Sequence, residues 1–312
     1  MNVALITDEN YVIPTGTAIA SILQSNPDGQ FVFYIITKFL EKKSVSLLKS
    51  FLEPNKDRAL LEICSLSDEY KTDFPIRKGD HVSVATYFRF FFENLIPQNV
   101  DKLLFLDGDT LCVDSIADFY NTDLDGFSCA AIHDENNDDE RAYERLKYPP
   151  ENGYFNAGVM LINLDWWRKN GVMQKCVDYI SAEPDSCLWH DQDALNHVLN
   201  GTVRWADFRY NFMQGFFFTK EDMRISPQFY ESIDNARKNP CILHYSSAYK
   251  PWHEECNHPL KNMYRDFYRQ YTGKKLAVRH KLRGFALIKW KLKKMLAQFG
   301  ICHFADFRRA VL

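Results

Sequence analysis

Three features are missing from the sequence, and each absence excludes a class of protein. The eight cysteines are scattered without any C-x-x-C pair, which is typical of reduced, buried thiols and not of a disulfide framework. No basic segment accompanies the short apolar run at the N-terminus, so we expect no signal peptide. No uninterrupted apolar stretch is long enough to span a bilayer. The sequence therefore predicts a protein that is made and kept inside the cell.

The composition predicts one large α/β domain, alone or with an appendage. Of the 312 residues, 46% are apolar and 15% are aromatic, so the chain can bury a large core. The net charge of −3 hides an uneven distribution, because residues 273–312 hold eleven Lys or Arg and a single acid. This segment carries +10 and the remainder about −13, so we expect the tail and the body to have different roles.

Short strand-like runs alternate with helix-like runs, a pattern that favours an α/β fold with one mostly parallel sheet covered by helices. The predicted strands are 3–6, 31–36, 59–64, 102–106, 128–133, 157–164 and 241–243. The predicted helices are 17–23, 40–51, 86–95, 166–180 and 191–199. Residues 134–153 are rich in charged and amide side chains and contain two prolines, so they are predicted to form a surface loop or lid.

The segment Leu-Phe-Leu-Asp-Gly-Asp-Thr at residues 104–110 is the most informative of the chain. Alternate residues of an extended segment point the same way, so Asp107 and Asp109 can present both carboxylates to one point at the carboxyl end of a strand. Two hard oxygen donors at that place suit Mn²⁺ or Mg²⁺ carrying a diphosphate. The alternative is a β-turn in which Asp-Gly-Asp supplies turn chemistry alone.

Further polar clusters follow other predicted strands or begin helices. Residues 7–11 (Thr-Asp-Glu-Asn-Tyr) offer groups for a base and its ribose, or simply a helix N-cap. Residues 155–158 (Phe-Asn-Ala-Gly) allow a backbone or a ligand to approach closely. Residues 190–193 begin a helix in which Asp191 is a possible N-cap, and His244 after the last strand is either a ligand or a structural histidine.

Taken together and in this order, these motifs resemble glycosyltransferase family 8, especially the bacterial lipopolysaccharide α-galactosyl- and α-glucosyltransferases. The resemblance covers roughly residues 1–260, which would form the catalytic domain. It implies a GT-A fold, UDP-galactose or UDP-glucose as donor, Mn²⁺ with Mg²⁺ possible, and transfer to a saccharide acceptor with retention at the anomeric carbon. Lipopolysaccharide or another cell-surface glycan would be the product.

The resemblance also assigns roles to individual residues. Those that would bind uridine are Asp8, Asn10 and Tyr11. Those that would hold the metal ion are Asp107, Asp109 and His244, while Lys250 would contact the diphosphate. Those that would surround the donor sugar are Arg89, Asp134, Asn156, Ala157, Gly158, Asp191 and Gln192.

Two features depart from the family pattern. Ser247 and Ala248 stand where close relatives have Gly-Pro after His-Tyr-x. The family's backbone contact to phosphate is made at that glycine, so at Ser247 it would have to be made by a residue with a side chain. Position 6 is Ile and not a small residue, although its contact would be made by the backbone.

Retention requires a nucleophile on the β face of the sugar or attack by the acceptor on the front side. The resemblance places Gln192 beneath the β face, and an amide is a poor nucleophile. We therefore favour front-side attack, in which the leaving phosphate oxygen takes the acceptor proton. Asp191 would hold sugar hydroxyls, and Asp134 is the carboxylate available for a covalent route.

The C-terminal segment 261–312 is predicted to be a basic, amphipathic, membrane-associating tail. Between residues 281 and 299 the apolar side chains fall on one helical stripe, and the basic ones lie mostly elsewhere. Such a helix can lie on an anionic membrane, where lipid-linked acceptors are found, so we expect a cytoplasmic protein peripheral to the inner face of the cytoplasmic membrane. The alternative is a helix packed on the domain. Nucleic acid is not expected as a partner, because the body is acidic.

Three other functions share some of these features. A sugar-1-phosphate nucleotidyltransferase would need a Gly-rich, basic phosphate loop near the N-terminus, which this sequence lacks. A glycogenin-like self-glucosylating protein would show a mass increase with UDP-glucose. A non-catalytic, membrane-bound sugar-nucleotide binder would keep the uridine site without turnover.

Overall fold

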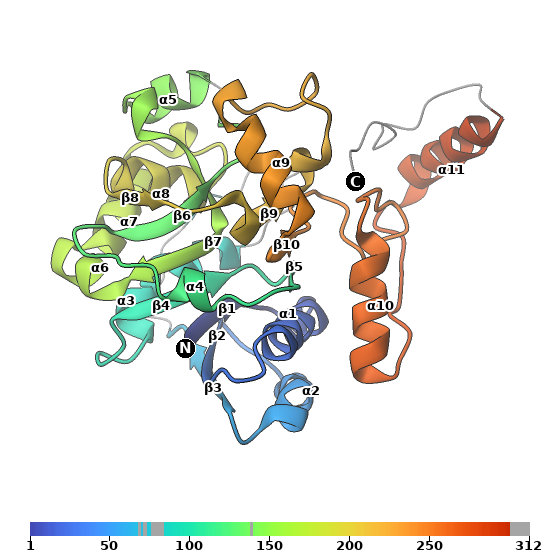
Figure 1. The fold of residues 1–312 in the computed structure, drawn as a ribbon, viewed down its shortest axis with the longest axis horizontal. Coiled ribbons are helices and arrows are strands. Elements are labelled where there is room, and N and C mark those ends of the chain that lie inside the picture. Colours follow the sequence, from blue (N-terminus) through green and yellow to red (C-terminus); the bar gives the residue numbers. More distant parts are fainter. Residues whose placement is uncertain (68–69, 71–73, 76–83, 138–139, 300–312) are drawn as a thin grey trace.

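The computed structural model describes residues 1–67, 70, 74–75, 84–137 and 140–299 (Figure 1). The strands of the large sheet are β1 (Asn2–Ile6), β2 (Phe31–Thr37), β3 (Ala59–Ser65), β4 (Lys102–Leu106), β6 (Cys129–His133), β7 (Phe155–Asn163) and β8 (Val203–Trp205). The small sheet consists of β5 (Thr110–Cys112), β9 (Phe212–Met213) and β10 (Ile242–His244). The helices are α1 (Val12–Ser25), α2 (Lys42–Leu52), α3 (Phe92–Leu95), α4 (Ala117–Tyr120), α5 (Glu140–Leu146), α6 (Leu164–Asn170), α7 (Val172–Ala182), α8 (Asp191–Leu199), α9 (Tyr230–Lys238), α10 (Lys261–Thr272) and α11 (Gly284–Gln298).

The large sheet confirms the predicted mostly parallel α/β architecture. Its strand order is β3-β2-β1-β4-β7-β6-β8, and every neighbouring pair is parallel except the two that include β7. Because β7 runs the opposite way, its first residues lie at the edge where β1, β4 and β6 end. Polar segments from four strands therefore meet at one edge of the sheet.

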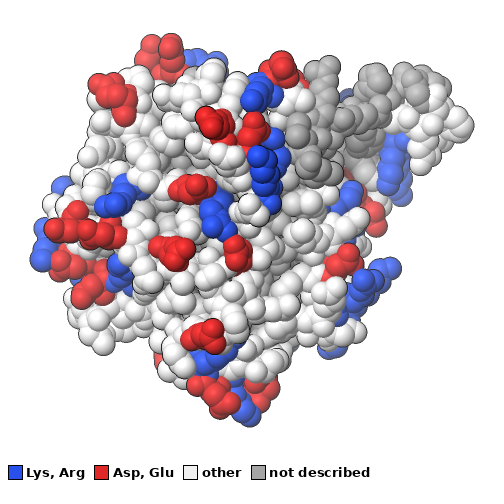
Figure 2. Space-filling view, in the orientation of Figure 1, with Lys and Arg blue, Asp and Glu red and all other residues white. Residues whose placement is uncertain are grey.

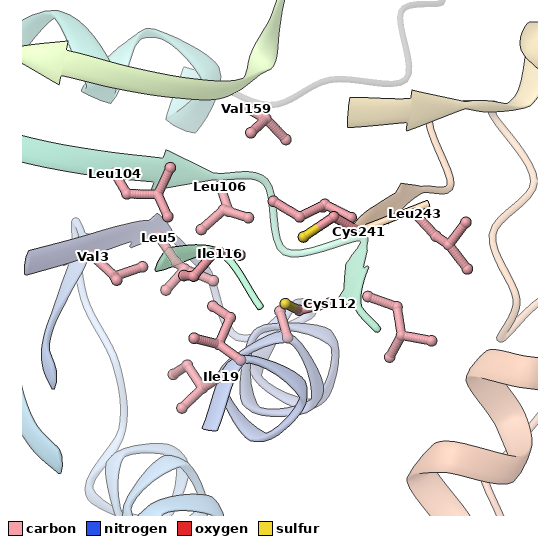
Figure 3. Packing of buried hydrophobic residues seen from close by; sticks show 14 of the residues in the cluster. Val3, Leu5, Ile19, Leu104, Leu106, Cys112, Ile116, Val159, Cys241 and Leu243 are labelled. Atoms are coloured by element: carbon pink, nitrogen blue, oxygen red, sulfur yellow. The ribbon is translucent and has the colours of Figure 1, made fainter. Parts of the chain in front are cut away.

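Both faces of the central strands of the large sheet are buried, as the apolar strands predict, whereas the edge strand β3 is partly exposed. Alternate side chains of β4 enter two separate cores: Leu104 and Leu106 face α1, while Leu103 and Phe105 face the opposite helices. Figure 3 shows the first core, in which Leu104 and Leu106 lie with side chains from β1, β7 and α1 next to the small sheet. Burial on both faces holds the end of β4 rigidly, which matters for the aspartates that follow.

Several predicted elements differ in detail from the observed ones. The predicted surface loop 134–153 is wrong in part, because α5 lies within it. The predicted aromatic helix 86–95 is a 3-10 helix (Val84–Phe91) continued by the short α3. The single helical run predicted at 166–180 is divided into α6 and α7 at Gly171, whose φ of 60° lies in the left-handed region. The seven cysteines within the described residues are free, and all but Cys64 are buried.

The first part of the predicted tail packs on the body. Tyr264 and Tyr268 of α10 and Leu276 after it belong to the same core as α1 and α2. Further on, the buried Glu255 carboxylate accepts hydrogen bonds from the backbone N–H groups of Lys281 and Leu282 at 3.0 and 3.3 Å. The chain is thus tied to the body as far as residue 282.

Replacing the fully buried Tyr264 should therefore destabilise the whole domain. Tyr264→Ala removes a large ring from the core and should lower the free energy of unfolding by about 3–5 kcal/mol, measured by urea denaturation. Tyr264→Phe keeps the ring, and Met263→Ala changes an exposed side chain of the same helix, so both should cost much less. Equal losses for Tyr264→Ala and Met263→Ala would show that α10 does not support the core.

Candidate functional site

Three side chains that could hold a metal ion meet where β4 ends. Asp107 and Asp109 follow β4, and β10 pairs antiparallel with β5 so that His244 lies opposite Thr110. The ligand atoms of Asp107, Asp109 and His244 lie within 4.8 Å of one another. His244 Nε2 is 3.9 Å from Asp107 Oδ2 and 3.4 Å from Asp109 Oδ1. The structure thus brings together the two predicted aspartates and the predicted histidine.

The surroundings of this cluster fit a bound cation. Asp109 Oδ1 is buried and receives no hydrogen bond, an unusual state for a buried carboxylate oxygen. At Gly158, a Cβ atom would lie 2.4 Å from His244 Cε1 and 2.7 Å from Asp107 Oδ2, so any side chain there would fill the space between the ligands. Two carboxylates and one imidazole form a suitable donor set for a divalent ion of the Mn²⁺ type.

A chain of amides fixes the orientation of His244. Asn156 Nδ2 donates to the Asp134 carboxylate at 3.0 Å, so Asn156 Oδ1 is the atom that accepts from Asn211 Nδ2 at 3.0 Å. Asn211 Oδ1 then faces His244 Nδ1 at 2.9 Å, and this nitrogen must carry the proton. The lone pair of Nε2 therefore points toward the two aspartates. Asn211 is fully buried, and no motif in the sequence marked it.

The two aspartates have opposite electrostatic environments. Burial disfavours ionisation of Asp109, but the Lys250 ammonium, 2.5 Å from Asp109 Oδ2, outweighs it and holds the pKa of Asp109 below its usual value. Burial raises the pKa of Asp107 despite the attraction of Arg89, and the charge of Asp109 adds to the increase. Lys250 thus lies within the same charged cluster as Asp107, Asp109 and His244.

Arg89 lies in the 3-10 helix before α3 and contacts three parts of the site: the end of β4, the start of α8 and the start of β7. Its guanidinium lies over the Phe105 ring and forms ion pairs with Asp107 at 3.2 Å and Asp191 at 2.8 Å. It also donates to the Ala157 carbonyl at 2.5 Å. The interpretation of Asp191 as an N-cap is wrong, since Asp191 is the first residue of α8 and its side chain bonds to Thr86 and Arg89.

Gln192 lies between the start of β7 and Asp134. Its Oε1 accepts hydrogen bonds from the Ala157 N–H at 3.0 Å and from Asn156 Nδ2 at 3.2 Å. Its Nε2 donates to Asp134 Oδ2 at 3.2 Å. The other oxygen of Asp134 accepts from the backbone N–H of Asn136 at 2.9 Å. Gln192 and Asp134, the carboxylate available for a covalent route, are therefore both already hydrogen-bonded.

The loop after β1 lies on the other side of the aspartates. A Cβ atom at Gly108 would lie 3.3 Å from the Tyr11 ring, and Tyr11 packs edge-to-face on Trp252 with ring centroids 5.6 Å apart. Burial, together with Asp109 and Asp107, raises the pKa of Tyr11 well above its usual value. Asp8 caps the turn before α1, because its Oδ1 accepts from the backbone N–H groups of Asn10 and Tyr11 at 2.8 and 3.1 Å.

Two predicted site residues lie at the margin. Asn10 is exposed, and its contribution to the turn comes from its backbone. Ser247 Oγ donates to the Tyr249 carbonyl of the same loop at 3.1 Å. Lys250 Nζ donates to the Tyr245 carbonyl, which lies in this loop as well. The loop is thus closed by its own side chains.

Comparisons with known proteins agree with this geometry. The profile of Glycosyl transferase family 8 matches residues 2–256. The chain is 28% identical over 270 residues to a lipopolysaccharide 1,2-glucosyltransferase of Escherichia coli, covering 86% of this chain and 77% of that protein. It is 25% identical over 268 residues to a lipopolysaccharide 1,3-galactosyltransferase of Salmonella typhimurium, covering 84% and 76%.

A solved structure shares the fold. The galactosyltransferase LgtC, crystallised with donor and acceptor sugar analogues, superposes with a TM-score of 0.78 at 24% identity and covers 93% of this chain and 99% of its own. The shared fold is GT-A, and the cluster of Asp107, Asp109 and His244 could hold a divalent metal ion. The match over residues 2–256 shows that the chain belongs to glycosyl transferase family 8, whose members are retaining UDP-sugar-dependent glycosyltransferases.

Proposed function

We propose that this chain transfers glucose or galactose from its UDP derivative to a hydroxyl group of a saccharide acceptor during lipopolysaccharide or other cell-surface glycan synthesis. The single observation that carries the proposal is the convergence of the aspartate pair and His244 with Gln192 at one edge of the sheet. The names of the Escherichia coli and Salmonella relatives support the choice of sugars and of acceptor class.

The donor would bind across the edge of the sheet with its uridine at β1 and its sugar at β7. The aromatic face of Tyr11 next to Gly108 suits a pyrimidine, and Asp8 and Asn10 offer polar groups for the base or ribose. The opposite side of the aspartate pair carries Arg89, Asp191 and the start of β7, which suit sugar hydroxyls. The diphosphate would then lie between them, next to Lys250.

Departure of UDP leaves negative charge on the β-phosphate. Mn²⁺ held by Asp107, Asp109 and His244, with Mg²⁺ as an alternative, would supply positive charge to stabilise that leaving group. Lys250 supplies a second positive charge from the protein itself. Its ammonium hydrogen-bonds to Asp109 and to the Tyr245 carbonyl, which hold it at the phosphate side of the site.

Front-side attack by the acceptor suits the residues beneath the sugar. The Gln192 amide is a poor nucleophile, and its oxygen already accepts two hydrogen bonds. Asp134 accepts hydrogen bonds at both oxygens, which weakens it as a nucleophile for a covalent route. Gln192 would instead present its amide dipole to the positive charge that develops at the anomeric carbon.

The C-terminal helix α11 would hold the enzyme on an anionic membrane. Phe285, Ile288 and Phe299 are 79%, 63% and 73% exposed, and no residue of α11 is buried. Figure 1 shows α11 extending from the body beyond α10, and Figure 2 shows basic side chains on that arm. An exposed apolar stripe with lysines beside it suits the interface of an anionic bilayer. Of the helices that the structure describes, none has the length and apolar character needed to cross a membrane.

We also propose that the catalytic domain ends later than the predicted residue 260. Because Glu255 bonds to residues 281 and 282 and α10 joins the core, we place the separable tail after Leu282.

The uridine assignment predicts nucleotide selectivity. UDP should raise the melting temperature more than ADP or GDP at equal concentration, since the ligand with the higher affinity stabilises the fold more. Tyr11→Ala should reduce this preference, and hydrolysis of UDP-glucose and UDP-galactose should identify the donor. Equal shifts from the three nucleotides would contradict the assignment.

The metal assignment predicts that Asp109→Asn weakens Mn²⁺ binding by about tenfold or more, measured by isothermal titration calorimetry, and removes most turnover. Asp118→Asn, an exposed carboxylate on α4, is the matched control and should bind Mn²⁺ like the wild type. The metal role fails if the two variants bind Mn²⁺ equally well, or if full activity persists in EDTA.

The tail assignment predicts salt-sensitive binding to anionic vesicles. Lys289→Gln with Lys291→Gln should weaken binding by about 2 kcal/mol, roughly 30-fold in the partition coefficient, because each basic residue near the bilayer contributes about 1 kcal/mol. Lys42→Gln with Lys49→Gln removes the same charge from exposed positions of α2 and should leave binding unchanged. A chain ending at Leu282 should hydrolyse the donor without sedimenting with vesicles. Loss of binding in the α2 variant to the same degree would mean that net charge alone is responsible.

A further inference from the structure

A chain of polar side chains with a buried centre runs from α5 to Gln192. Arg145 of α5 forms a bidentate ion pair with Asp193 of α8, with distances of 2.7 and 3.2 Å. Asp193 is fully buried and also accepts from the backbone N–H of Trp189 at 2.7 Å. Tyr154 Oη lies 2.8 Å from Asp193 Oδ1 and 3.1 Å from Gln192 Nε2. We call Arg145, Asp193 and Tyr154 the tyrosine chain.

The direction of each hydrogen bond in this chain is determined. Asp193 is paired with a guanidinium and can only accept, so the Tyr154 hydroxyl must donate to it. Burial, reinforced by Asp193, raises the pKa of Tyr154 well above its usual value, which keeps this proton on the phenol. A lone pair of Tyr154 Oη is then left to accept from the Gln192 amide.

These directions permit one orientation of the Gln192 amide. Its NH₂ group faces two acceptors, Tyr154 Oη and Asp134 Oδ2, and its oxygen faces two donors, the Ala157 N–H and Asn156 Nδ2. A flipped amide would set an oxygen against the Asp134 carboxylate and an NH₂ group against the Ala157 N–H. Each unmade buried hydrogen bond is costly, so the flipped state is strongly disfavoured.

We infer that Tyr154 is a positioning residue that fixes the Gln192 amide beneath the donor sugar, and that Arg145 of α5 orders Tyr154 through Asp193. This inference rests on the proposed role of Gln192. It also gives the helix within residues 134–153 a specific role, because α5 carries the guanidinium that holds the Asp193 carboxylate in place. Tyr154 and Arg145 would not touch the substrate.

Tyr154→Phe is the cleanest probe of the tyrosine chain. It deletes one oxygen while Asp193 keeps Arg145 and Trp189, whereas replacing Arg145 would leave a buried charge unpaired and endanger the fold. Tyr148→Phe is the matched control, because Tyr148 is also buried and its hydroxyl donates to the Gly153 carbonyl at 3.1 Å, away from Gln192.

The experiment is a double-mutant cycle on kcat for hydrolysis of the better UDP-sugar, with Tyr154→Phe and Gln192→Ala alone and combined. Tyr154→Phe should lower kcat about fivefold to tenfold, the worth of one hydrogen bond, with little change in the donor KM or in the melting temperature relative to Tyr148→Phe. In the Gln192→Ala background the same replacement should change kcat less than about twofold, because the amide that it positions is gone.

The outcomes separate this inference from the function on which it rests. Equal losses from Tyr154→Phe in both backgrounds, or equal losses from Tyr154→Phe and Tyr148→Phe, would overturn the positioning role while leaving Gln192 catalytic. A Gln192→Ala variant with wild-type kcat would overturn the role of Gln192 and this inference together.

Discussion

The antiparallel pairing of β7 with β4 determines where the polar groups of the site lie. The Asp107 N–H donates to the Gly158 carbonyl at 2.8 Å, which holds the start of β7 against the aspartate pair. From this position the Ala157 carbonyl accepts from Arg89 and the Ala157 N–H donates to Gln192. A parallel β7 would carry the same residues to the opposite edge of the sheet, and neither contact would form.

The site then has to accommodate several buried carboxylates in a small volume. Asp109, Asp191 and Asp193 are each less than one-tenth exposed, and each is matched by one cation: Lys250, Arg89 and Arg145 respectively. Removing one partner of such a pair is much more destabilising than replacing both, because an uncompensated buried charge remains. These pairs therefore act less as sources of stability than as constraints on geometry, since each carboxylate has one position in which its charge is compensated.

The sequence predicted those parts of the site that depend on local pattern. The run from Leu104 to Thr110 predicted both the strand and the position of its aspartates, because a period of two and an apolar strand are visible in a few residues. Family resemblance then named His244 and Gln192, which the structure places near them. The direction of β7 was not visible, since an apolar strand has the same pattern in either direction.

Residues that act through other side chains were also missed. Asn211 and Tyr154 lie in ordinary aromatic-rich segments, and their importance depends on contacts with residues 33 to 55 positions away. Arg145 was hidden for a different reason: its segment is polar and contains two prolines, so it was assigned to a loop, whereas tertiary contacts of Tyr143 and Leu146 with the core make it helical.

The start of the tail is hydrogen-bonded to the loop that carries Lys250, so the tail is not attached through a flexible linker. Lys281 Nζ donates to the Ala248 carbonyl at 2.8 Å, two residues before Lys250, while its backbone N–H bonds to Glu255. The lowered pKa of Lys281, caused by burial and then by Lys250, places the two ammonium groups in one electrostatic environment. The point from which α11 departs is thus fixed relative to Lys250 and Asp109. A surface bound by α11 would consequently lie at a defined distance and direction from the cluster of Asp107, Asp109 and His244.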